Sequence, residues 1–216
     1  GDFVKMIDYH VGDLLDHLKS LNLEENTMVI FTSDNGPYWW PESIERFNHK
    51  AALELKGMKG DIYDGGHRIP FMVKYPGVVK EKSTNSDVNS LASLMGTLGE
   101  MLGEKSNNIG IDSHSFYDAL MNDNYKAEPK SIIHHSSRGF FSIRKGKWKL
   151  IENLGSGGFS KPVFIKPNQG ENIYSLFDMD EDISEINNLS NKHPEIVKDL
   201  ITEMNSIKKK SFQLNP

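Results

Sequence analysis

An apolar run that stops abruptly at a carboxylate, an amide and a glycine constrains this chain more than any other feature. The run covers Met28–Phe31, and Asp34, Asn35 and Gly36 follow it closely. A short, continuous apolar stretch with β-branched residues is typical of a central parallel strand that is buried on both faces. Ligands of open α/β sheets gather at the carboxyl ends of such strands, so the turn after Phe31 is a candidate site.

The side chains of this turn allow two interpretations. Asp34 and Asn35 offer hard oxygen ligands of the kind that Ca²⁺ or Mg²⁺ prefers, and Gly36 permits the sharp departure that lets both face one point. The alternative is a plain Asx turn with an Asn-Gly tip, which is a common way to end a strand. The residues by themselves leave both interpretations open.

A second segment, residues 55–70, places a lysine beside a glycine-punctuated turn. The ammonium of Lys59 would complement a divalent cation if both bound one sulfate or phosphate group. The alternative is a solvated lysine, which is the commoner case. Residues 64–66 read as a turn into a strand, and Arg68 reads as a structural ion-pair partner rather than a catalyst.

Histidines flank the two segments. His49 and His67 are candidate acid/base or anion-binding groups, although lone histidines are more often structural or exposed to solvent. His134 and His135 alternate on a predicted strand, so at most one of them faces inward, and a structural role is preferred for both.

Residues 37–56 show no clean hydrophobic period, which predicts a surface loop near the end of the strand. Trp39 and Trp40 lie in this loop. They are candidates for stacking on a sugar or an aryl group beside the site, and core packing is an equal alternative.

The remaining pattern predicts an α/β unit followed by a smaller one. Apolar spacing predicts helices over 3–21, 89–102 and 195–207, a second apolar strand over 69–77, and strand-like segments over 131–135, 140–144, 147–151 and 172–178. A helix followed by a buried strand indicates an α/β sheet, whereas successive strands with tight turns indicate an antiparallel one. The polar stretch 122–130 contains the predicted boundary, which divides the chain into units 1–128 and 129–216.

Composition excludes several classes of function. Hydrophobic residues make up 37% and charged residues 25%, as in an ordinary globular protein, and the formal net charge of -5 argues against a nucleic-acid partner. No apolar run approaches the roughly 18–20 residues of a membrane span. The chain has no cysteine, which rules out disulfides, thiolate metal sites and a cysteine nucleophile within it.

Taken together, the segments resemble the type I sulfatase (arylsulfatase) family of the alkaline phosphatase superfamily. The resemblance rests on Ser-Asp-Asn-Gly at 33–36 and on Leu-Lys-Gly-Met-Lys-Gly-Asp-Ile-Tyr-Asp-Gly-Gly-His-Arg-Ile-Pro-Phe at 55–71, followed by Tyr-Pro-Gly at 75–77. Segments 111–120, 143–150 and 173–189 are similar, in order, to the family's "DG-x-S-F", "R-x-G-x-W-K" and "LYDL-x-x-D-P-x-E-x-x-N-L" segments. The similarity therefore runs over nearly the whole chain.

The resemblance implies a fold and a set of roles. The fold would be part of an alkaline-phosphatase-like α/β/α sandwich, followed by a small C-terminal antiparallel sheet packed with a helix. Asp34 and Asn35 match metal ligands, usually for Ca²⁺, and Lys59 matches the catalytic lysine that contacts the sulfate group. His49 is a looser match to the segment that lines the substrate pocket. Arg68 and the glycines before it match structural positions.

The sequence departs from the family at the nucleophile. The family uses a formylglycine made from Cys or Ser in a C/S-x-P-x-R motif, and this chain contains no such motif. We interpret the chain as a C-terminal portion of a sulfatase that needs the N-terminal part of the same protein, and that hydrolyses nothing by itself. The resemblance implies an aryl or carbohydrate sulfate as substrate and a periplasmic or secreted bacterial setting. A phosphoryl or phosphonate ester hydrolase, or a truncated non-catalytic binding subunit, are the alternatives.

Overall fold

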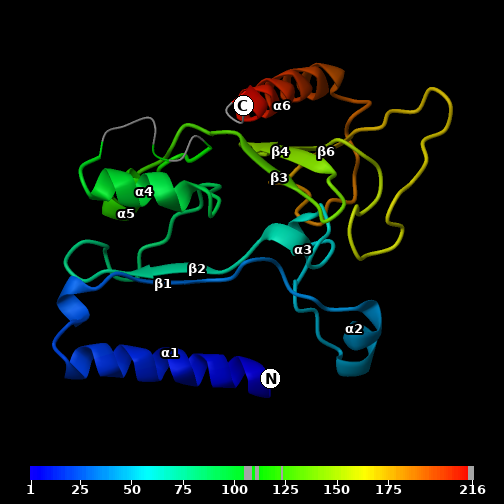
Figure 1. Ribbon diagram of the computed structural model, residues 1–216. Helices are drawn as coiled ribbons and strands as arrows, with labels where there is room; N and C mark the ends of the chain where they lie inside the picture. Colours follow the sequence, from blue (N-terminus) through cyan, green and yellow to red (C-terminus); the bar gives the residue numbers. More distant parts are fainter. Residues whose placement is uncertain (105–108, 110–111, 123, 214–216) are drawn as a thin grey trace.

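The structure is a computed structural model, and it describes residues 1–104, 109, 112–122 and 124–213. The N-terminal part begins with a long helix, α1 (Asp2–Ser20), a 3₁₀ turn, η1 (Glu24–Asn26), and the strand β1 (Val29–Thr32). Two short helices follow, α2 (Pro41–Phe47) and α3 (Asp64–His67), and then the strand β2 (Phe71–Lys74). The helices α4 (Ser93–Met101) and α5 (Tyr117–Met121) complete this part (Figure 1).

Strands β1 and β2 form an antiparallel pair, with Val29 opposite Lys74 and Thr32 opposite Phe71. The prediction of a parallel strand buried on both faces was therefore wrong within the described residues, where β1 is only half-buried and forms a two-stranded sheet with β2. The reason is that the chain between them folds back on itself. Gly36, just after β1, donates a backbone hydrogen bond of 2.9 Å to Gly66, just before β2, and the two strands consequently run in opposite directions.

Two other local predictions were also wrong. Residues 37–56 contain the helix α2 rather than only a loop, and Pro41 occupies its first turn, where the missing N–H of proline costs nothing. Residues 64–67 form the one-turn helix α3 rather than a simple turn. Both helices are too short to show a full hydrophobic period, so the sequence pattern could not reveal them.

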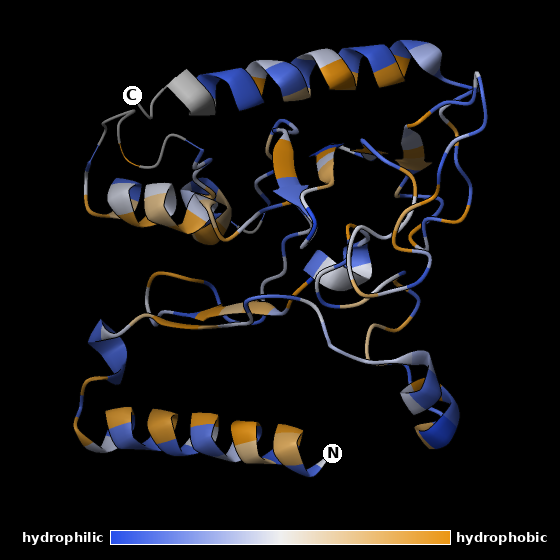
Figure 2. Cartoon of the chain, turned by 45° about the vertical axis from the view of Figure 1, so that its right-hand side comes forward, coloured by the Kyte–Doolittle hydropathy of each residue, from blue (hydrophilic) through white to orange (hydrophobic). Residues whose placement is uncertain are grey.

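The helix α1 contributes no buried residue in this chain. Figure 2 shows its hydrophobic residues on the side toward the β1–β2 pair, and Phe3 and Leu14 remain 69% and 52% exposed. The predicted helix is confirmed, but its apolar face is not covered by the described residues. None of the described helices combines the length and the apolar character needed to span a bilayer.

The C-terminal part is a four-stranded antiparallel sheet with a long helix on one face. The strands are β3 (Ile132–His135), β4 (Phe141–Lys145), β5 (Trp148–Ile151) and β6 (Ser175–Asp178), paired in that order, and the helix is α6 (Pro194–Gln213). The tight turn predicted at residues 145–146 joins β4 to β5, and Gly146 takes the positive φ of 55° that such a turn needs. The predicted antiparallel sheet with its terminal helix is confirmed.

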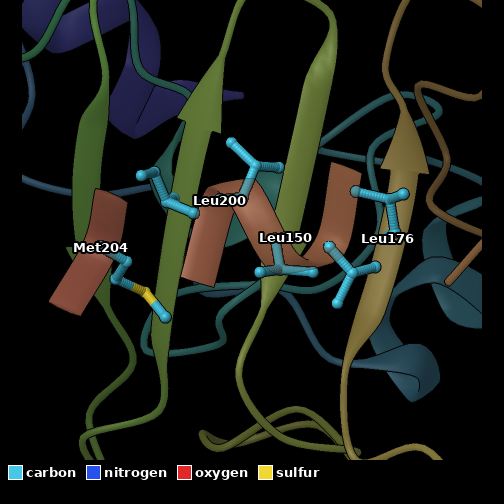
Figure 3. Close-up of a cluster of buried hydrophobic side chains, with 6 residues drawn as sticks. Leu150, Leu176, Leu200 and Met204 are labelled. Atoms are coloured by element: carbon cyan, nitrogen blue, oxygen red, sulfur yellow. The ribbon is translucent and has the colours of Figure 1, made fainter. Parts of the chain in front are cut away.

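Both faces of this sheet are buried, each against a different partner. Figure 3 shows Leu150 and Leu176 pointing toward Leu200 and Met204 of α6, and all four are at most 4% exposed. Burying a leucine side chain contributes about 1.5–3 kcal/mol, so this layer fixes α6 on the sheet. Because successive residues of a strand point to opposite faces, Lys149 lies on the other side. There the sheet meets Ile62 and the helix α3.

The proposed division of the chain at residues 128 and 129 falls between α5 and β3. This division stays a prediction. Hydrogen bonds and ion pairs join the two parts of the chain, as the site below shows.

Candidate functional site

The predicted metal-binding turn directly follows β1. The side chain of Asp34 is exposed and that of Asn35 is half-buried. The turn is held internally, since the Ser33 hydroxyl donates to the Asn35 carbonyl at 3.1 Å and the Asn35 amide nitrogen donates to the Gly36 carbonyl at 3.0 Å. The nitrogen of the Asn35 amide is thereby used within the turn, which leaves its oxygen for another partner.

The structure brings this turn against the second predicted segment. The backbone N–H of Lys59 donates to the Pro37 carbonyl at 2.9 Å, and Gly36 donates to Gly66 at the same distance. The approach is so close that a Cβ added to Gly36 would collide with the carbonyl oxygen of Gly65. Glycine at position 36 is therefore required by a backbone contact, not only by the turn.

The Lys59 side chain is exposed, and within the described residues its ammonium has no hydrogen-bond or ion-pair partner. It is thus available to an anion. The exposed His49 is less closely placed, since it connects to the turn through Trp39, whose indole N–H donates to the His49 carbonyl at 2.8 Å. No described contact joins the imidazole of His49 to Lys59. The backbone contacts thus join the turn of Asp34 and Asn35 to the loop of Lys59, and His49 takes no part in them.

A buried carboxylate that sequence reasoning missed holds the Lys59 loop in place. Asp61 is fully buried and accepts backbone hydrogen bonds from Met58 (2.9 Å), Phe159 (2.7 Å) and Ser160 (3.0 Å). Met58 lies on one side of Lys59, whereas Phe159 and Ser160 belong to the loop after β5. The C-terminal part therefore forms one wall of the Lys59 loop.

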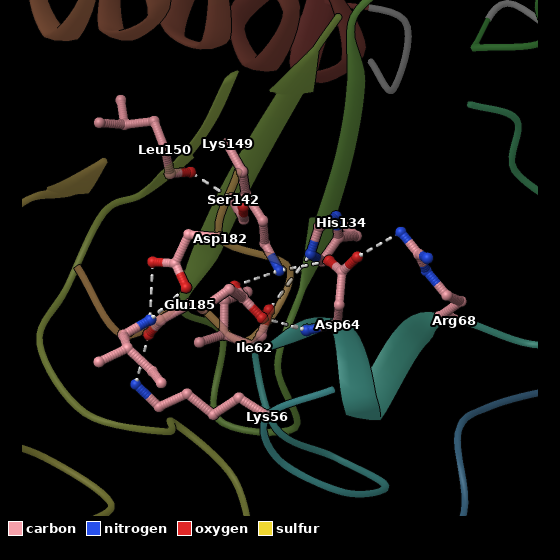
Figure 4. A network of polar contacts seen from close by, with 11 residues as sticks. Lys56, Ile62, Asp64, Arg68, His134, Ser142, Lys149, Leu150, Asp182 and Glu185 are labelled. Carbon is pink, nitrogen blue, oxygen red and sulfur yellow. Dashed lines mark hydrogen bonds and ion pairs between the residues drawn. The ribbon is translucent and has the colours of Figure 1, made fainter. Parts of the chain in front are cut away.

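Next to this contact lies a network of buried charges (Figure 4). Lys149 is fully buried, and its ammonium lies 2.7 Å from Asp64 Oδ1 and 2.7 Å from Glu185 Oε1. Asp64 also pairs with Arg68 at 3.2 Å, and Glu185 accepts the Asp64 backbone N–H at 2.7 Å. Arg68 therefore forms an ion pair, as predicted, and its structural role stays a prediction. Lys149 belongs to the motif at 143–150, but nothing in the local sequence shows that it is buried.

The carboxylates of this network titrate in opposite directions. Burial opposes the ionisation of Asp64, but the charge and hydrogen bond of Lys149, aided by Arg68 and Arg144, lower its pKa to about 2. Burial raises the pKa of Glu185 above its ordinary value, and the attraction of Lys149 only partly offsets this effect. Asp64 is therefore the firmly ionised partner of Lys149.

Two histidines complete this buried layer. The rings of His67 and His134 lie 4.1 Å apart, and His134 Nε2 lies 3.3 Å from the Ile62 carbonyl. Burial, together with the charge of Lys149, lowers the pKa of His67 to about 4 and that of His134 well below its ordinary value. His134 faces inward and His135 is exposed, as the alternation on the strand predicts. Both inner histidines are neutral near pH 7, which suits a packing role.

The donor set of the turn suits a hard cation but is incomplete in this chain. Asp34 and Asn35 supply one carboxylate and one amide oxygen, whereas Ca²⁺ takes about six to eight oxygens. Within the described ranges, no three His, Cys, Asp or Glu side chains gather closely enough to hold a metal ion. The residues present therefore fit a part of a Ca²⁺ or Mg²⁺ site.

Comparison with known proteins places these features in one family. Residues 1–104 match the family model described as "Sulfatase". The chain is 31% identical, over 96% of its length, to an N-acetylgalactosamine-6-O-sulfatase of Bacteroides thetaiotaomicron, and 32% identical, over 69% of its length, to human arylsulfatase A. It covers 41% and 29% of those proteins respectively, so it spans well under half of the curated relatives that it matches.

Solved structures agree with the sequence matches. One from work on glycosaminoglycan metabolism by Bacteroides thetaiotaomicron superposes with a TM-score of 0.80 at 29% identity, over 94% of this chain and 43% of that one. Another, which holds a neocarrahexaose, gives a TM-score of 0.70 at 26% identity, over 94% of this chain and 41% of that one. With the family model, the relatives and the fold in agreement, the chain belongs to the sulfatase family.

Proposed function

We propose that this chain is a C-terminal portion of a sulfuric ester hydrolase and supplies part of its anion-handling site. The observation that carries the proposal is the junction of two segments distant in sequence. The turn at Asp34 and Asn35 and the loop of Lys59 are joined by the hydrogen bonds from Gly36 and Lys59 described above. These backbone contacts join the segment that carries the proposed oxygen ligands to the segment that carries the unpaired ammonium, which supports the proposal.

Each residue then has a definite role. Lys59 contacts the sulfate group and offsets the negative charge that develops on it, which is the main way in which sites of this kind lower a barrier. Asp34 and Asn35 hold Ca²⁺, or Mg²⁺, and such an ion, when bound, neutralises further negative charge on the sulfate oxygens. His49 lines the substrate pocket at its edge. Asp61 keeps Lys59 in position through the backbone.

The remaining parts of the enzyme lie outside this chain in our proposal. A formylglycine nucleophile and the other metal ligands come from the N-terminal part of the same protein, because neither a C/S-x-P-x-R motif nor a cysteine is present here. The substrate is an aryl or carbohydrate sulfate, as the names of the relatives suggest for those proteins. A periplasmic or secreted bacterial setting is part of the proposal.

Terbium(III) luminescence tests the metal ligands in the purified 216-residue chain. Tb³⁺ replaces Ca²⁺ at oxygen sites and is sensitised by nearby indoles, which Trp39 and Trp40 provide. We expect weak binding that Ca²⁺ displaces, and an at least fivefold loss of affinity in Asp34→Asn. Asp8→Asn, in the exposed helix α1, is the matched control and should bind like the wild type. Equal affinity of Asp34→Asn and the control would refute the metal assignment.

Anion binding and activity test the rest of the proposal. The wild-type chain should bind inorganic sulfate and Lys59→Met should not, whereas a preference for phosphate over sulfate would favour a phosphoryl ester hydrolase. The chain alone should release no 4-nitrophenol from 4-nitrophenyl sulfate. Robust hydrolysis by this chain would overturn the proposal that its nucleophile lies elsewhere.

A further inference from the structure

Three exposed aromatic side chains form a cluster at the edge of the candidate site. Tyr38, Trp40 and Phe159 are 54%, 36% and 42% exposed. The ring of Tyr38 lies 5.5 Å from that of Trp40 and 5.7 Å from that of Phe159, in edge-to-face geometry in both cases. Single exposed aromatics are common, but here Tyr38 contacts both Trp40 and Phe159, and such a group of exposed rings is of the kind that marks a binding site.

The cluster is attached to the Lys59 loop from two directions. Tyr38 directly follows Pro37, whose carbonyl accepts the Lys59 N–H at 2.9 Å. Phe159 is fixed by the Asp61 carboxylate, and its ring packs so closely on Gly60 that a Cβ there would lie 3.0 Å from Phe159 Cε2. Tyr38 and Phe159 therefore border the loop from which the Lys59 ammonium extends, and Trp40 joins them through its contact with Tyr38.

The polar atoms of the cluster are unused within the described part of the chain. The hydroxyl of Tyr38 and the indole N–H of Trp40 have no hydrogen-bond partner there, whereas the neighbouring Trp39 donates its N–H to His49 and packs on the ring of Phe47. The two adjacent tryptophans therefore have different surroundings in the structure. Trp39 is a packing residue, and Trp40 presents both an apolar ring and a free donor to solvent.

We propose that Tyr38, Trp40 and Phe159 form a stacking platform for the pyranose ring of a sulfated sugar, with the sulfate group directed to Lys59. A pyranose has an apolar C–H face that packs on aromatic rings and hydroxyls that pair with donors at their rim, which is the combination found here. The inference rests on the function proposed above and narrows its substrate class. It selects a carbohydrate sulfate over a simple aryl sulfate, which has no hydroxyls for the free polar atoms.

Saturation-transfer NMR on the 216-residue chain tests the platform with four probes: N-acetylgalactosamine 6-sulfate, N-acetylgalactosamine, inorganic sulfate and 4-nitrophenyl sulfate. For the sugar sulfate we expect saturation of the ring protons, and an affinity loss of about tenfold in Trp40→Ala and in Phe159→Ala, which corresponds to about 1.4 kcal/mol. Affinity for inorganic sulfate should stay unchanged in both variants. Tyr9→Ala, at a 70% exposed aromatic on α1, is the matched control and should bind every probe like the wild type. Urea unfolding of all three variants checks that each stays folded, since Trp40 and Phe159 are only 36% and 42% exposed.

The outcomes separate the platform from the underlying function. If Lys59→Met abolishes binding of the sugar sulfate while the aromatic variants stay within twofold of wild type, the platform is wrong and the sulfate contact stands. If Lys59→Met binds sulfate and the sugar sulfate normally, Lys59 does not contact the sulfate group. The proposal that a sugar on the platform directs its sulfate to Lys59 then fails as well. Absent saturation of the ring protons, or tighter binding of 4-nitrophenyl sulfate than of the sugar sulfate, would overturn the sugar assignment.

Discussion

Replacing the buried lysine of the charge network gives the sharpest test of how the two parts of the chain are held together. Lys149→Met keeps the volume of the side chain and removes its charge. Asp64 and Glu185, each 2.7 Å from the ammonium, then face each other without it, and Asp64 retains only the more exposed Arg68. Breaking a buried ion pair by removing one partner costs about 3–5 kcal/mol, because the remaining charge is left uncompensated.

The neighbouring strand residue provides the control. Lys147 forms an ion pair of 2.6 Å with Asp178, but its side chain is 47% exposed, whereas that of Lys149 is 0% exposed. Solvent screens the exposed pair, so Lys147→Met should destabilise the chain far less than Lys149→Met. Urea unfolding followed by circular dichroism measures both variants, and the melting temperature of Lys149→Met should fall by roughly 10 °C.

The cost of Lys149→Met should also depend on pH and on Glu185. Burial already raises the pKa of Glu185, and loss of Lys149 raises it further, so this carboxyl takes up a proton in the folded variant. Protonation relieves the uncompensated charge, and the deficit should be smaller at pH 5 than at pH 8. Glu185→Gln added to Lys149→Met should recover part of the loss. A penalty equal to that of Lys147→Met, or one independent of pH, would refute the assignment of Lys149 as the charge that the interface requires.

Three further changes test the packing around the site by urea unfolding. Gly36→Ala should destabilise the chain by about 2 kcal/mol, because the added Cβ would collide with the backbone of Gly65. Gly12→Ala is the control, since nothing lies within 4 Å of its Cβ, and it should stabilise α1 by about 0.5–1 kcal/mol. Equal effects of the two substitutions would contradict the close approach at Gly36. Asp61→Asn should cost about 2–3 kcal/mol by replacing an acceptor of three backbone N–H groups with a partial donor, and faster amide exchange at Phe159 is the local readout. Burial lowers the pKa of His67 from 6.5 to about 4, so between these values the unfolded chain binds a proton that the folded chain does not, and stability falls as the pH drops through this window. His67→Gln should remove up to about 3 kcal/mol of that decline, and an unchanged pH profile would show that His67 is not buried as described.

Much of the candidate site was predictable from short stretches of sequence. The carboxylate and amide after an apolar run placed Asp34 and Asn35 at the end of a strand, and the glycine-punctuated segment singled out Lys59. The position of the turn at a strand end is confirmed, because a strand end and a turn depend on neighbouring residues, whereas the roles of these side chains stay predictions. The direction of pairing was not predictable in the same way. An apolar run such as Met28–Phe31 has the same appearance in a parallel and in an antiparallel sheet, and here it pairs antiparallel with β2.

The two adjacent tryptophans show where local pattern ends. Trp39 and Trp40 are equivalent in the sequence, and the alternatives of packing and stacking applied to both. Only their surroundings differ, since the ring of Trp39 lies against Phe47 and His49, while that of Trp40 meets Tyr38 in solvent. The different surroundings of the two rings arise from the direction of the backbone after Pro37. They cannot be predicted from the residue type, which is the same at both positions.

By itself, the sequence determined the helices and strands with a clear period, the antiparallel character of the C-terminal sheet, and the identity of the residues that could meet a sulfate and a cation. The tertiary structure decided which of these groups meet. Lys149 and Asp64 are 85 positions apart, and Asp61 and Phe159 are 98 apart, yet each pair lies within hydrogen-bonding distance. Hydrophobic periodicity records only which side of an element is buried, so it contains no information on what lies opposite. That is why Lys149 looked like any lysine of a strand, and became the buried charge that joins the two parts of the chain.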